Sequence, residues 1–175
     1  SEREVIHSMP IGFSLDAERG VRDPRGMVGD TLGVDMHVLT ADAAPLRNLE
    51  LCINRSHLSV ERFVATPYAS GLSALVEDET EMGAACIDFG GGTTTLAIFV
   101  DGKLSHVDSL PIGGSHVTMD LAKGLSTRLS HAERLKVMHG SALAVGGDDR
   151  DIVTINPMGE EGDVPLQVPR SVMNR

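Results

Sequence analysis

A glycine-rich stretch holds the residue types in this chain that are best suited to chemistry. Residues 87–95 read Ile-Asp-Phe-Gly-Gly-Gly-Thr-Thr-Thr and lie between two apolar segments, 84–87 and 96–100, which we expect to form neighbouring strands. Glycine loses more backbone entropy on folding than any other residue, so three in a row are unfavourable in a plain hairpin. They are useful where bare amides must approach a ligand closely or where φ is positive.

Such a turn can bind anionic oxygens. Backbone amides that point into one concavity form a nest for phosphate, and Asp88 at the edge of the same turn is suited to hold Mg²⁺ through its water shell. Together they predict a site for the phosphates and metal of a nucleoside triphosphate. The alternative is a tight hairpin in which the glycines only relieve steric clashes and Asp88 caps the turn, because short glycine motifs often occur by chance.

Composition narrows the classes of function. The 175 residues carry a formal net charge of −10, which argues against nucleic acid as a partner because neutralising phosphates requires a basic surface. Cys52 and Cys86 both lie among apolar residues and are predicted to be core side chains of a cytosolic protein. No apolar run reaches the roughly 20 residues that span a bilayer. No signal peptide is recognised, and we expect the sequence to be an excerpt of a longer protein.

The first 65 residues are predicted to form a small α+β unit. β-Branched and apolar residues favour strands over 5–15, 32–39 and 58–65, and Asp42 is placed to cap a helix between the last two. A unit of strand, strand, helix and strand with this length is within the size range of an independent module.

The remaining elements place the glycine stretch in a sheet. Thr66 and Pro67 are predicted to cap and begin a second helix. The dipeptide Asp101-Gly102 is a strong signal for a two-residue hairpin, so the strands around the glycine stretch become part of an antiparallel meander. Further predictions are a solvated acidic link at 77–81, a helix over 117–129, a capping box from Ser130 to Glu133 that starts a helix over 132–138, and a short strand at 152–155.

The order of these features resembles the actin and heat-shock chaperone ATPase superfamily. Residues 68–71, Tyr-Ala-Ser-Gly on a predicted helix, precede the run from Cys86 to Thr93 as the connecting helix precedes the second phosphate loop in that fold. Within the superfamily the chain is most similar to the FtsA family of bacterial actin-like cell-division proteins, from about Ile6 to Leu143. The segments that carry this likeness are 7–10, 38–41, 69–70, 77–79, 88–93, 110–111 and 132–143.

The resemblance implies a mixed fold of α+β and α/β type. It consists of an actin-like, ribonuclease-H-like ATPase subdomain, called IIA, preceded by a small α+β module called 1C. Residues 1–65 correspond to the 1C-like interaction module. Residues 66–143 correspond to the end of subdomain IA, IIA and the first helix of IIB, which form the floor of the nucleotide cleft. Residues 144–175 correspond to a loop-rich part of IIB.

The resemblance also implies ligands for particular residues of this sequence, and none of these residues is expected to be catalytic. Glu133 has a second explanation as the carboxylate of the capping box, and most lysines on helices are simply solvated. The implied ligands are ATP phosphates at Gly90, Gly91, Gly92, Thr93 and Thr94, Mg²⁺ held through water at Asp88, and the nucleoside at Glu133 and Lys136.

The implied function is that of an ATP-binding scaffold that links FtsZ filaments to the membrane and recruits later septal proteins. It would work in the cytoplasm, at the inner face of the cell membrane at the division site. The 1C-like module would support self-association into filaments and bind late division proteins, and membrane contact would use a tail absent from this sequence. The first phosphate loop and the late glycine motif are also absent, so we expect this chain alone to bind ATP poorly.

Hydrolysis is expected to be weak or absent. Arg62 stands where the superfamily often places a water-orienting Gln or Glu. Two alternatives for the function stay open: a chaperone-type ATPase whose purpose is hydrolysis, and a pilus-assembly ATP-binding protein of the same fold that shares a 1C-like module.

Overall fold

The computed structural model describes residues 2–143, 145–158 and 165–174. These residues form two compact units. The chain up to Asp88 together with Thr95–Ser109 makes the first, and Phe89–Thr94 together with the chain from Leu110 onward makes the second. The three glycines of the glycine-rich stretch therefore belong to the second unit, whereas Ile87, Asp88 and Thr95 belong to the first. Within the predicted segment 144–175, residue 144 and residues 159–164 lie outside the described residues.

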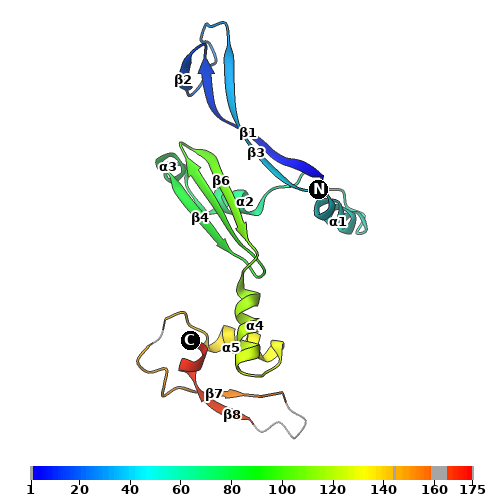
Figure 1. Ribbon diagram of the computed structural model, residues 1–175, viewed down its shortest axis with the longest axis vertical. Coiled ribbons are helices and arrows are strands. Elements are labelled where there is room, and N and C mark those ends of the chain that lie inside the picture. Colours follow the sequence, from blue (N-terminus) through cyan, green and yellow to red (C-terminus); the bar gives the residue numbers. More distant parts are fainter. Residues whose placement is uncertain (1, 144, 159–164, 175) are drawn as a thin grey trace. The chain divides into compact units, whose positions relative to one another are not determined.

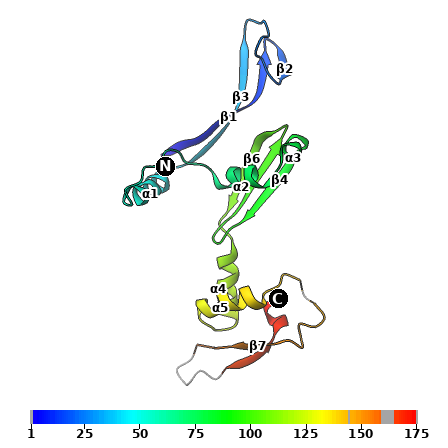
Figure 2. The ribbon, with the colours of Figure 1, turned by 180° about the vertical axis from the view of Figure 1, so that it is seen from behind.

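A three-stranded sheet begins the first unit (Figures 1 and 2). It consists of β1 (Arg3–Leu15), β2 (Glu18–Val21) and β3 (Leu32–Asp42), in the order β2-β1-β3. β1 pairs antiparallel with β3 along its whole length, with two irregularities in register. Two of these strands were predicted from the sequence. β2 was not, because its residues lie in a stretch rich in Gly, Asp and Pro.

Helix α1 (Ala43–Asn54) follows β3 directly, with Asp42 at its N-cap position as predicted. This helix buries only Ala43. Cys52 is therefore exposed, and its predicted place in the core is wrong, because the apolar face of α1 packs against little of the described chain.

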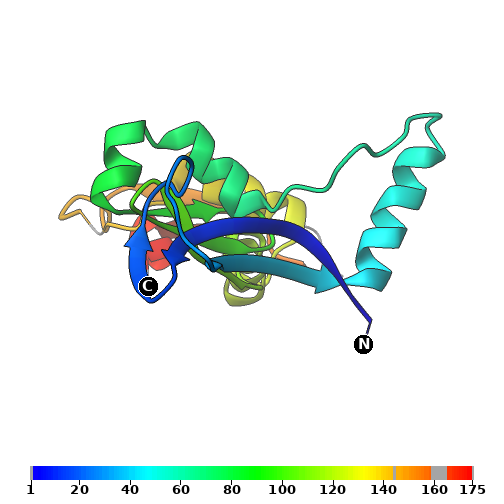
Figure 3. The ribbon, with the colours of Figure 1, turned by 90° about the horizontal axis from the view of Figure 1, so that it is seen from above.

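The prediction of a strand over residues 58–65 is wrong. This segment runs without regular secondary structure from α1 to α2, as Figure 3 shows. Its last amide, that of Ala65, donates a hydrogen bond to Nε2 of His7 (3.0 Å). Apolar and β-branched residues favour an extended backbone, but a strand also requires a neighbouring strand with which to pair, and this segment has none among the described residues.

A second sheet contains β4 (Ala84–Phe89), β5 (Thr94–Val100) and β6 (Lys103–Leu110), in that order. Asp101 and Gly102 join β5 to β6 with φ angles of 51° and 71°, the left-handed pair that a two-residue hairpin requires. Connections this short can only join antiparallel strands. The predicted meander is therefore confirmed.

Two helices, α2 (Thr66–Ala74) and α3 (Glu77–Met82), lie against one face of this sheet (Figure 3). The core beneath them is formed by Ala97, Phe99 and Leu104, which are at most 3% exposed. Gly71 of α2 lies directly against the Phe99 ring, so closely that a Cβ atom there would collide with it. The absence of a side chain at this position lets the helix pack closely on the sheet.

Two predictions about α2 and α3 are wrong, one about an N-cap residue and one about an acidic link. The N-cap of α2 is Ala65 rather than Thr66, a shift of one residue that is common at helix ends. The acidic stretch 77–81 forms most of α3 rather than a link. The Glu79 carboxylate accepts a hydrogen bond from the Val76 amide (3.0 Å), and acidic residues in a first turn complement the helix dipole.

The second unit contains α4 (Gly114–Gly124), α5 (Leu129–His139), β7 (Ile152–Ile155), β8 (Leu166–Pro169) and the short 3₁₀ helix η1 (Arg170–Asn174). β7 matches its predicted range, whereas its antiparallel partner β8 was not predicted. The predicted helix over 117–129 ends early because Ser126 has a φ of 48°. Among the described residues, no helix has the length and apolar character needed to cross a bilayer.

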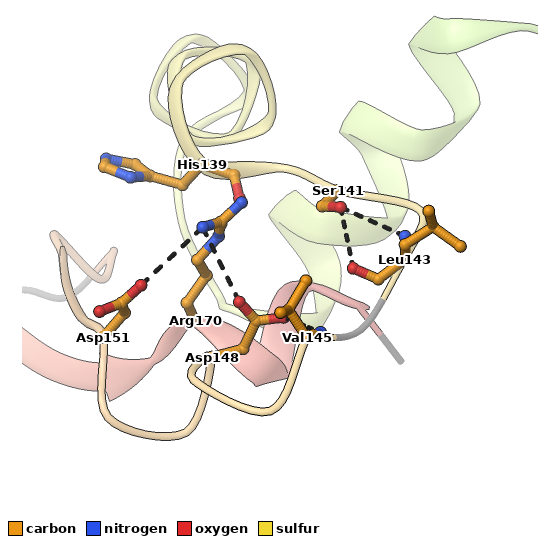
Figure 4. A network of polar contacts seen from close by, with 7 residues as sticks. All are labelled: His139, Ser141, Leu143, Val145, Asp148, Asp151 and Arg170. Carbon is orange, nitrogen blue, oxygen red and sulfur yellow. Dashed lines mark hydrogen bonds and ion pairs between the residues drawn. The ribbon is translucent and has the colours of Figure 1, made fainter.

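A polar network around Arg170 joins the end of α5 to η1 (Figure 4). The Arg170 side chain donates from Nε to the His139 carbonyl oxygen (2.8 Å). Its guanidinium also lies 3.8 Å from the Asp148 carboxylate and 3.9 Å from that of Asp151. Asp148 in turn accepts a hydrogen bond from the Val145 amide (2.8 Å). The segment between α5 and β7 is thus held against the helix end.

Candidate functional site

The glycine loop, defined here as Gly90–Thr93, connects β4 to β5. Its ends are closed by the Gly90 amide, which donates to the Thr93 carbonyl oxygen (2.9 Å). The positive-φ glycines of the described chain lie elsewhere, at 20, 26, 83 and 102. Cβ atoms built at Gly91 and Gly92 would meet nothing closer than 3.8 Å. The fold itself therefore gives no reason for glycine at these two positions, whereas a ligand that must approach the backbone does.

The first turn of α4 determines which way the loop amides point. The Gly114 amide donates to the Gly90 carbonyl oxygen (3.0 Å), and the Ser115 amide donates to that of Gly91 (2.7 Å). In a trans peptide the N–H points opposite to the C=O. The amides of Gly91 and Gly92 consequently point away from α4, and within the described residues they donate to no other group.

Gly113 permits this close approach of helix and loop. A Cβ atom at Gly113 would lie 2.5 Å from the Gly90 carbonyl oxygen and 2.7 Å from that of Gly91, distances that real Cβ contacts do not reach. Its φ of −160° is ordinary extended backbone, so the requirement for glycine comes from space and not from conformation.

The two threonines that end the run differ in position. Thr93 is exposed, and within the described residues neither its amide nor its hydroxyl forms a hydrogen bond. The Thr94 hydroxyl instead donates to the Ile112 carbonyl oxygen (2.7 Å), so its proton is already used inside the protein. Of the five residues predicted to contact phosphate, Gly91, Gly92 and Thr93 present unused amides.

Glu133 and Lys136 lie on α5 and meet the buried Thr118 of α4. The Thr118 hydroxyl donates to Oε2 of Glu133. The Lys136 ammonium lies 2.8 Å from the same carboxylate oxygen. It also donates to the Thr118 hydroxyl (2.8 Å) and to the Gly114 carbonyl oxygen (3.0 Å). The three hydrogens of this ammonium therefore face three acceptors.

The structure excludes one of the two explanations of Glu133, that of a capping-box carboxylate. The helix begins at Leu129 with Arg128 as its N-cap and without a side-chain cap, so the predicted capping box from Ser130 is wrong. Hydrogen bonds from Lys136 first and Thr118 second lower the pKa of the Glu133 carboxyl. Glu133 is ionised at neutral pH, and Oε1, to which no hydrogen bond from the described residues is donated, is left to accept one from a ligand hydroxyl.

Lys136 also connects α5 to the glycine loop. Its ammonium binds the carbonyl of Gly114, and the amide of the same residue binds the Gly90 carbonyl. The loop, the first turn of α4 and the face of α5 with Glu133 are therefore joined by one chain of hydrogen bonds within the second unit. The residues predicted to bind phosphate and those predicted to bind the nucleoside thus belong to the same hydrogen-bonded network.

Asp88 belongs to the first unit and lies two residues before Gly90 in sequence. It is half-buried at the end of β4. Oδ2 accepts a hydrogen bond from the Ser70 hydroxyl of α2 (2.6 Å). Within the described residues, no hydrogen bond is donated to Oδ1.

The residues present fit ATP phosphates with a hydrated metal ion. The unused amides suit anionic oxygens. The Thr95 hydroxyl oxygen is buried and finds no partner in the described chain, and a buried unpaired hydroxyl needs an explanation. Counting inward from the Gly90–Thr93 hydrogen bond places Thr95 opposite Asp88 on the neighbouring strand. Water bound to Mg²⁺ at Asp88 would supply the missing partner.

Several residues of this site were missed at the level of the sequence. The pair Gly113-Gly114 at the start of a predicted helical region was a usable signal, because glycine often marks a place where another backbone approaches closely. Ser70 and Thr118 gave no such signal. Their importance comes from contacts with residues 18 and 15 positions away, respectively.

Comparison with known proteins assigns the chain to a family. Residues 85–174 match the model of the cell division protein FtsA, and residues 1–40 match that of the SHS2 domain inserted in FtsA. The chain belongs to the FtsA family. The cell division protein FtsA of Rhizobium meliloti (strain 1021) is 62% identical over 176 residues, which cover 100% of this chain and 40% of that protein. FtsA of Escherichia coli (strain K12) is 35% identical, over 85% of this chain and 36% of that protein. The chain thus spans about two fifths of the length of these FtsA relatives.

Solved structures confirm the predicted actin-like fold of this FtsA-family chain. MreB5 of Spiroplasma citri bound to ADP superimposes with a TM-score of 0.63 and 20% identity, over 77% of this chain and 43% of that protein. A type IV pilus biogenesis complex of PilM and PilN gives a TM-score of 0.61 and 19% identity, over 79% of this chain and 38% of that one. At such identities the likeness concerns the fold alone.

Proposed function

We propose that this chain is the nucleotide-binding central segment of an actin-like cell-division scaffold. The observation that carries the proposal is the glycine loop, whose Gly91, Gly92 and Thr93 amides are unused. The first turn of α4 orients the Gly91 and Gly92 amides by holding the carbonyls of Gly90 and Gly91. Amides fixed in this way bind anionic oxygens without having to reorganise. The loop amides suit the phosphates of ATP, and Asp88 suits the hydrated Mg²⁺ that accompanies ATP.

Each predicted residue has a defined role in this proposal. Amides of the glycine loop hold the phosphates, and Gly90 and Thr94 fix the loop ends through their internal hydrogen bonds. Glu133 offers Oε1 to a ribose hydroxyl, and Lys136 flanks the nucleoside while holding Glu133 in place. Asp88 holds the hydrated metal, which when bound neutralises phosphate charge.

Membership of the FtsA family supports a proposal for the wider roles of the whole protein. The whole protein would link FtsZ filaments to the inner face of the cell membrane at the division site, with residues 1–65 as the 1C-like module for self-association and for late division proteins. Residues 66–143 would form the floor of the nucleotide cleft, and residues 144–175 part of IIB. Membrane contact would be made outside these 175 residues. ATP turnover would be slow, because Arg62, whose side chain is exposed, offers no group to orient water.

Substitution of Gly91 tests the proposal. A suitable host is a full-length protein in which this chain replaces the matching segment of the Rhizobium meliloti relative. Gly91→Val places a side chain over the unused amides, and its Cβ makes only an ordinary contact, 3.8 Å from the Ser115 hydroxyl oxygen. We expect the ATP affinity measured by calorimetry to fall at least about tenfold, or 1.4 kcal/mol. The thermal midpoint should change no more than it does in the control Gly124→Ala. This control lies at the end of α4, where a Cβ meets nothing within 4 Å.

Three results would contradict the proposal. ATP affinity in Gly91→Val equal to that of the unsubstituted host would remove the glycine loop from the site. Rapid phosphate release by the host would favour a chaperone-type ATPase over a scaffold. Binding to pilus components in place of FtsZ would favour the pilus-assembly alternative.

A further inference from the structure

We propose that Ser70 is a positioning residue for the metal-binding carboxylate. Its hydroxyl fixes the Asp88 side chain so that the second carboxylate oxygen is presented to water in the Mg²⁺ shell. This inference rests on the proposed function, because it concerns the metal that accompanies ATP.

The contact between the two side chains is short and joins separate elements. Oγ of Ser70 donates to Oδ2 of Asp88 over 2.6 Å, from α2 to the end of β4. Both residues are half-buried. Hydrogen bonds to an ionised carboxylate are about twice as strong as neutral ones and cluster near this length. The bond therefore holds one oxygen of the Asp88 carboxylate in place.

The packing of α2 on the sheet fixes the position of Ser70 and so supports its contact with Asp88. Gly71, the next residue, lies against the Phe99 ring with no room for a Cβ, and Pro67 at the start of the helix is buried. Tyr68 packs on the same core, with its ring stacked on that of Phe99 at 6.4 Å. The turn of α2 that carries Ser70 thus has a fixed height above the sheet.

Fixing one oxygen determines where the other lies. The last torsion of an aspartate is broad and roughly two-fold, so an untethered carboxylate rotates easily. With Oδ2 bound to Ser70, Oδ1 is the oxygen left free within the described residues. Outer-shell groups that orient the residues around a metal ion typically change metal affinity by about 10- to 100-fold when removed.

The test measures how much magnesium improves ATP binding. The dissociation constant of ATP is determined in the host with magnesium and again with EDTA, and the ratio of the two is the magnesium factor. Four variants are compared: Ser70→Ala, Ser70→Thr, which keeps the hydroxyl, Asp88→Asn, and Ser73→Ala as a matched control on the exposed side of α2. Thermal unfolding of each variant reports the fold.

Ser70→Ala is expected to lower the magnesium factor about tenfold, toward that of Asp88→Asn. Its EDTA affinity should stay within about twofold of the host, and Ser70→Thr and Ser73→Ala should keep the host's magnesium factor. An unchanged factor in Ser70→Ala beside a lowered factor in Asp88→Asn would overturn the inference and leave the proposed function intact. If Ser70→Ala lost as much ATP affinity in EDTA as with magnesium, the inference would also be overturned, because a residue with a purely structural role would affect both conditions. An unchanged factor in Asp88→Asn would instead reject the metal role in the proposed function.

Discussion

The glycine loop and the ribbon of β1 and β3 use their backbones in opposite ways. In the ribbon the two strands pair along their whole length, so the backbone groups that face the partner strand bind each other. What it presents is a row of side chains, the β3 strip, in which every second residue is apolar and 43–54% exposed: Leu32, Val34, Met36 and Val38. In the loop the three glycines have no side chains, and backbone amides are presented instead.

This difference shows that two kinds of surface need two kinds of support. Side chains on a paired strand alternate between faces without further help. Amides in a loop point in a useful direction only when the carbonyls of the same peptides are held, and here the first turn of α4 holds them. Substitutions next to the loop should therefore affect ligand binding through the backbone, whereas substitutions on the β3 strip should act only through the side chain that is removed.

The largest effect is expected for Gly113→Ala. The new Cβ would lie 2.5 Å and 2.7 Å from two loop carbonyl oxygens, so helix and loop must separate and the amides lose their orientation. We expect the free energy of unfolding to fall by about 1–3 kcal/mol, as in an overpacked core, and ATP affinity to fall more than tenfold, about 1.4 kcal/mol. Chemical denaturation and calorimetry of the host measure both.

Two controls sharpen the comparison. Gly124→Ala adds the same methyl group to the same helix where it meets no atom within 4 Å. Met36→Ser alters the β3 strip and should change stability by no more than about 0.5 kcal/mol, as for most surface substitutions, with ATP affinity unchanged. Equal ATP affinities for Gly113→Ala and Gly124→Ala would show that α4 does not orient the loop.

Thr118→Val should have an intermediate effect. It keeps the shape of a side chain that is 6% exposed but removes the hydroxyl between Glu133 and Lys136. Loss of a partner for a buried donor costs about 1–3 kcal/mol, so the host should be destabilised by about that amount. Because Glu133 loses its orientation, affinity for ATP should fall more than affinity for inorganic tripolyphosphate, which lacks a nucleoside. Thr118→Ser should restore both, and equal losses for the two ligands would argue against a role at the nucleoside.

The smallest expected effect is a pH dependence of stability at His7, where β1 contacts the residues around α2. His7 accepts the Ala65 amide hydrogen bond and packs edge-on against Tyr68 at 5.2 Å. Burial, and secondly the charge of Arg62, lower the pKa of His7 from its ordinary value of 6.5. A lowered histidine pKa means that the fold prefers the neutral ring, so this stabilisation is complete above pH 6.5 and is lost as the pH falls through the folded pKa.

His7→Gln provides the measurement. Glutamine can accept the same amide hydrogen bond but does not titrate in this range. The thermal midpoint of the unsubstituted host should therefore decrease more than that of His7→Gln between about pH 7 and pH 5. Parallel curves for the two proteins would mean that His7 does not contribute to the pH dependence.

Local signals in the sequence predicted much of the fold. The left-handed pair Asp101-Gly102 and the strand Ile152–Ile155 occur as predicted, because turn chemistry and short apolar alternation act over a few residues. Residues 58–65 show the limit of such signals. Their side chains favour an extended backbone, but whether a neighbouring strand is available depends on the rest of the fold.

For the candidate site too, the local sequence indicated some features, whereas others depend on residues distant in the chain. Glycines at 90–92 and Asp88 could be read as ligand-binding residues from their types and order alone. The direction of the amides could not, because it depends on Gly113 and on hydrogen bonds from a helix that begins more than twenty residues after Gly90. Glu133 was open to explanation as a cap until its contact with Thr118 of another helix was known.

The hydrogen bond from Arg170 to the last residue of α5 affects how this part of the molecule opens. The carbonyls of a final helical turn normally have no partner in the helix, which makes helix ends the first parts to fray. Here the His139 carbonyl is bound by a side chain 31 residues further along, which also faces Asp148. The end of α5 can open only when the segment leading out of β8 releases it. Stretches distant in sequence thus form one cooperative unit of local unfolding, with Lys136 inside it.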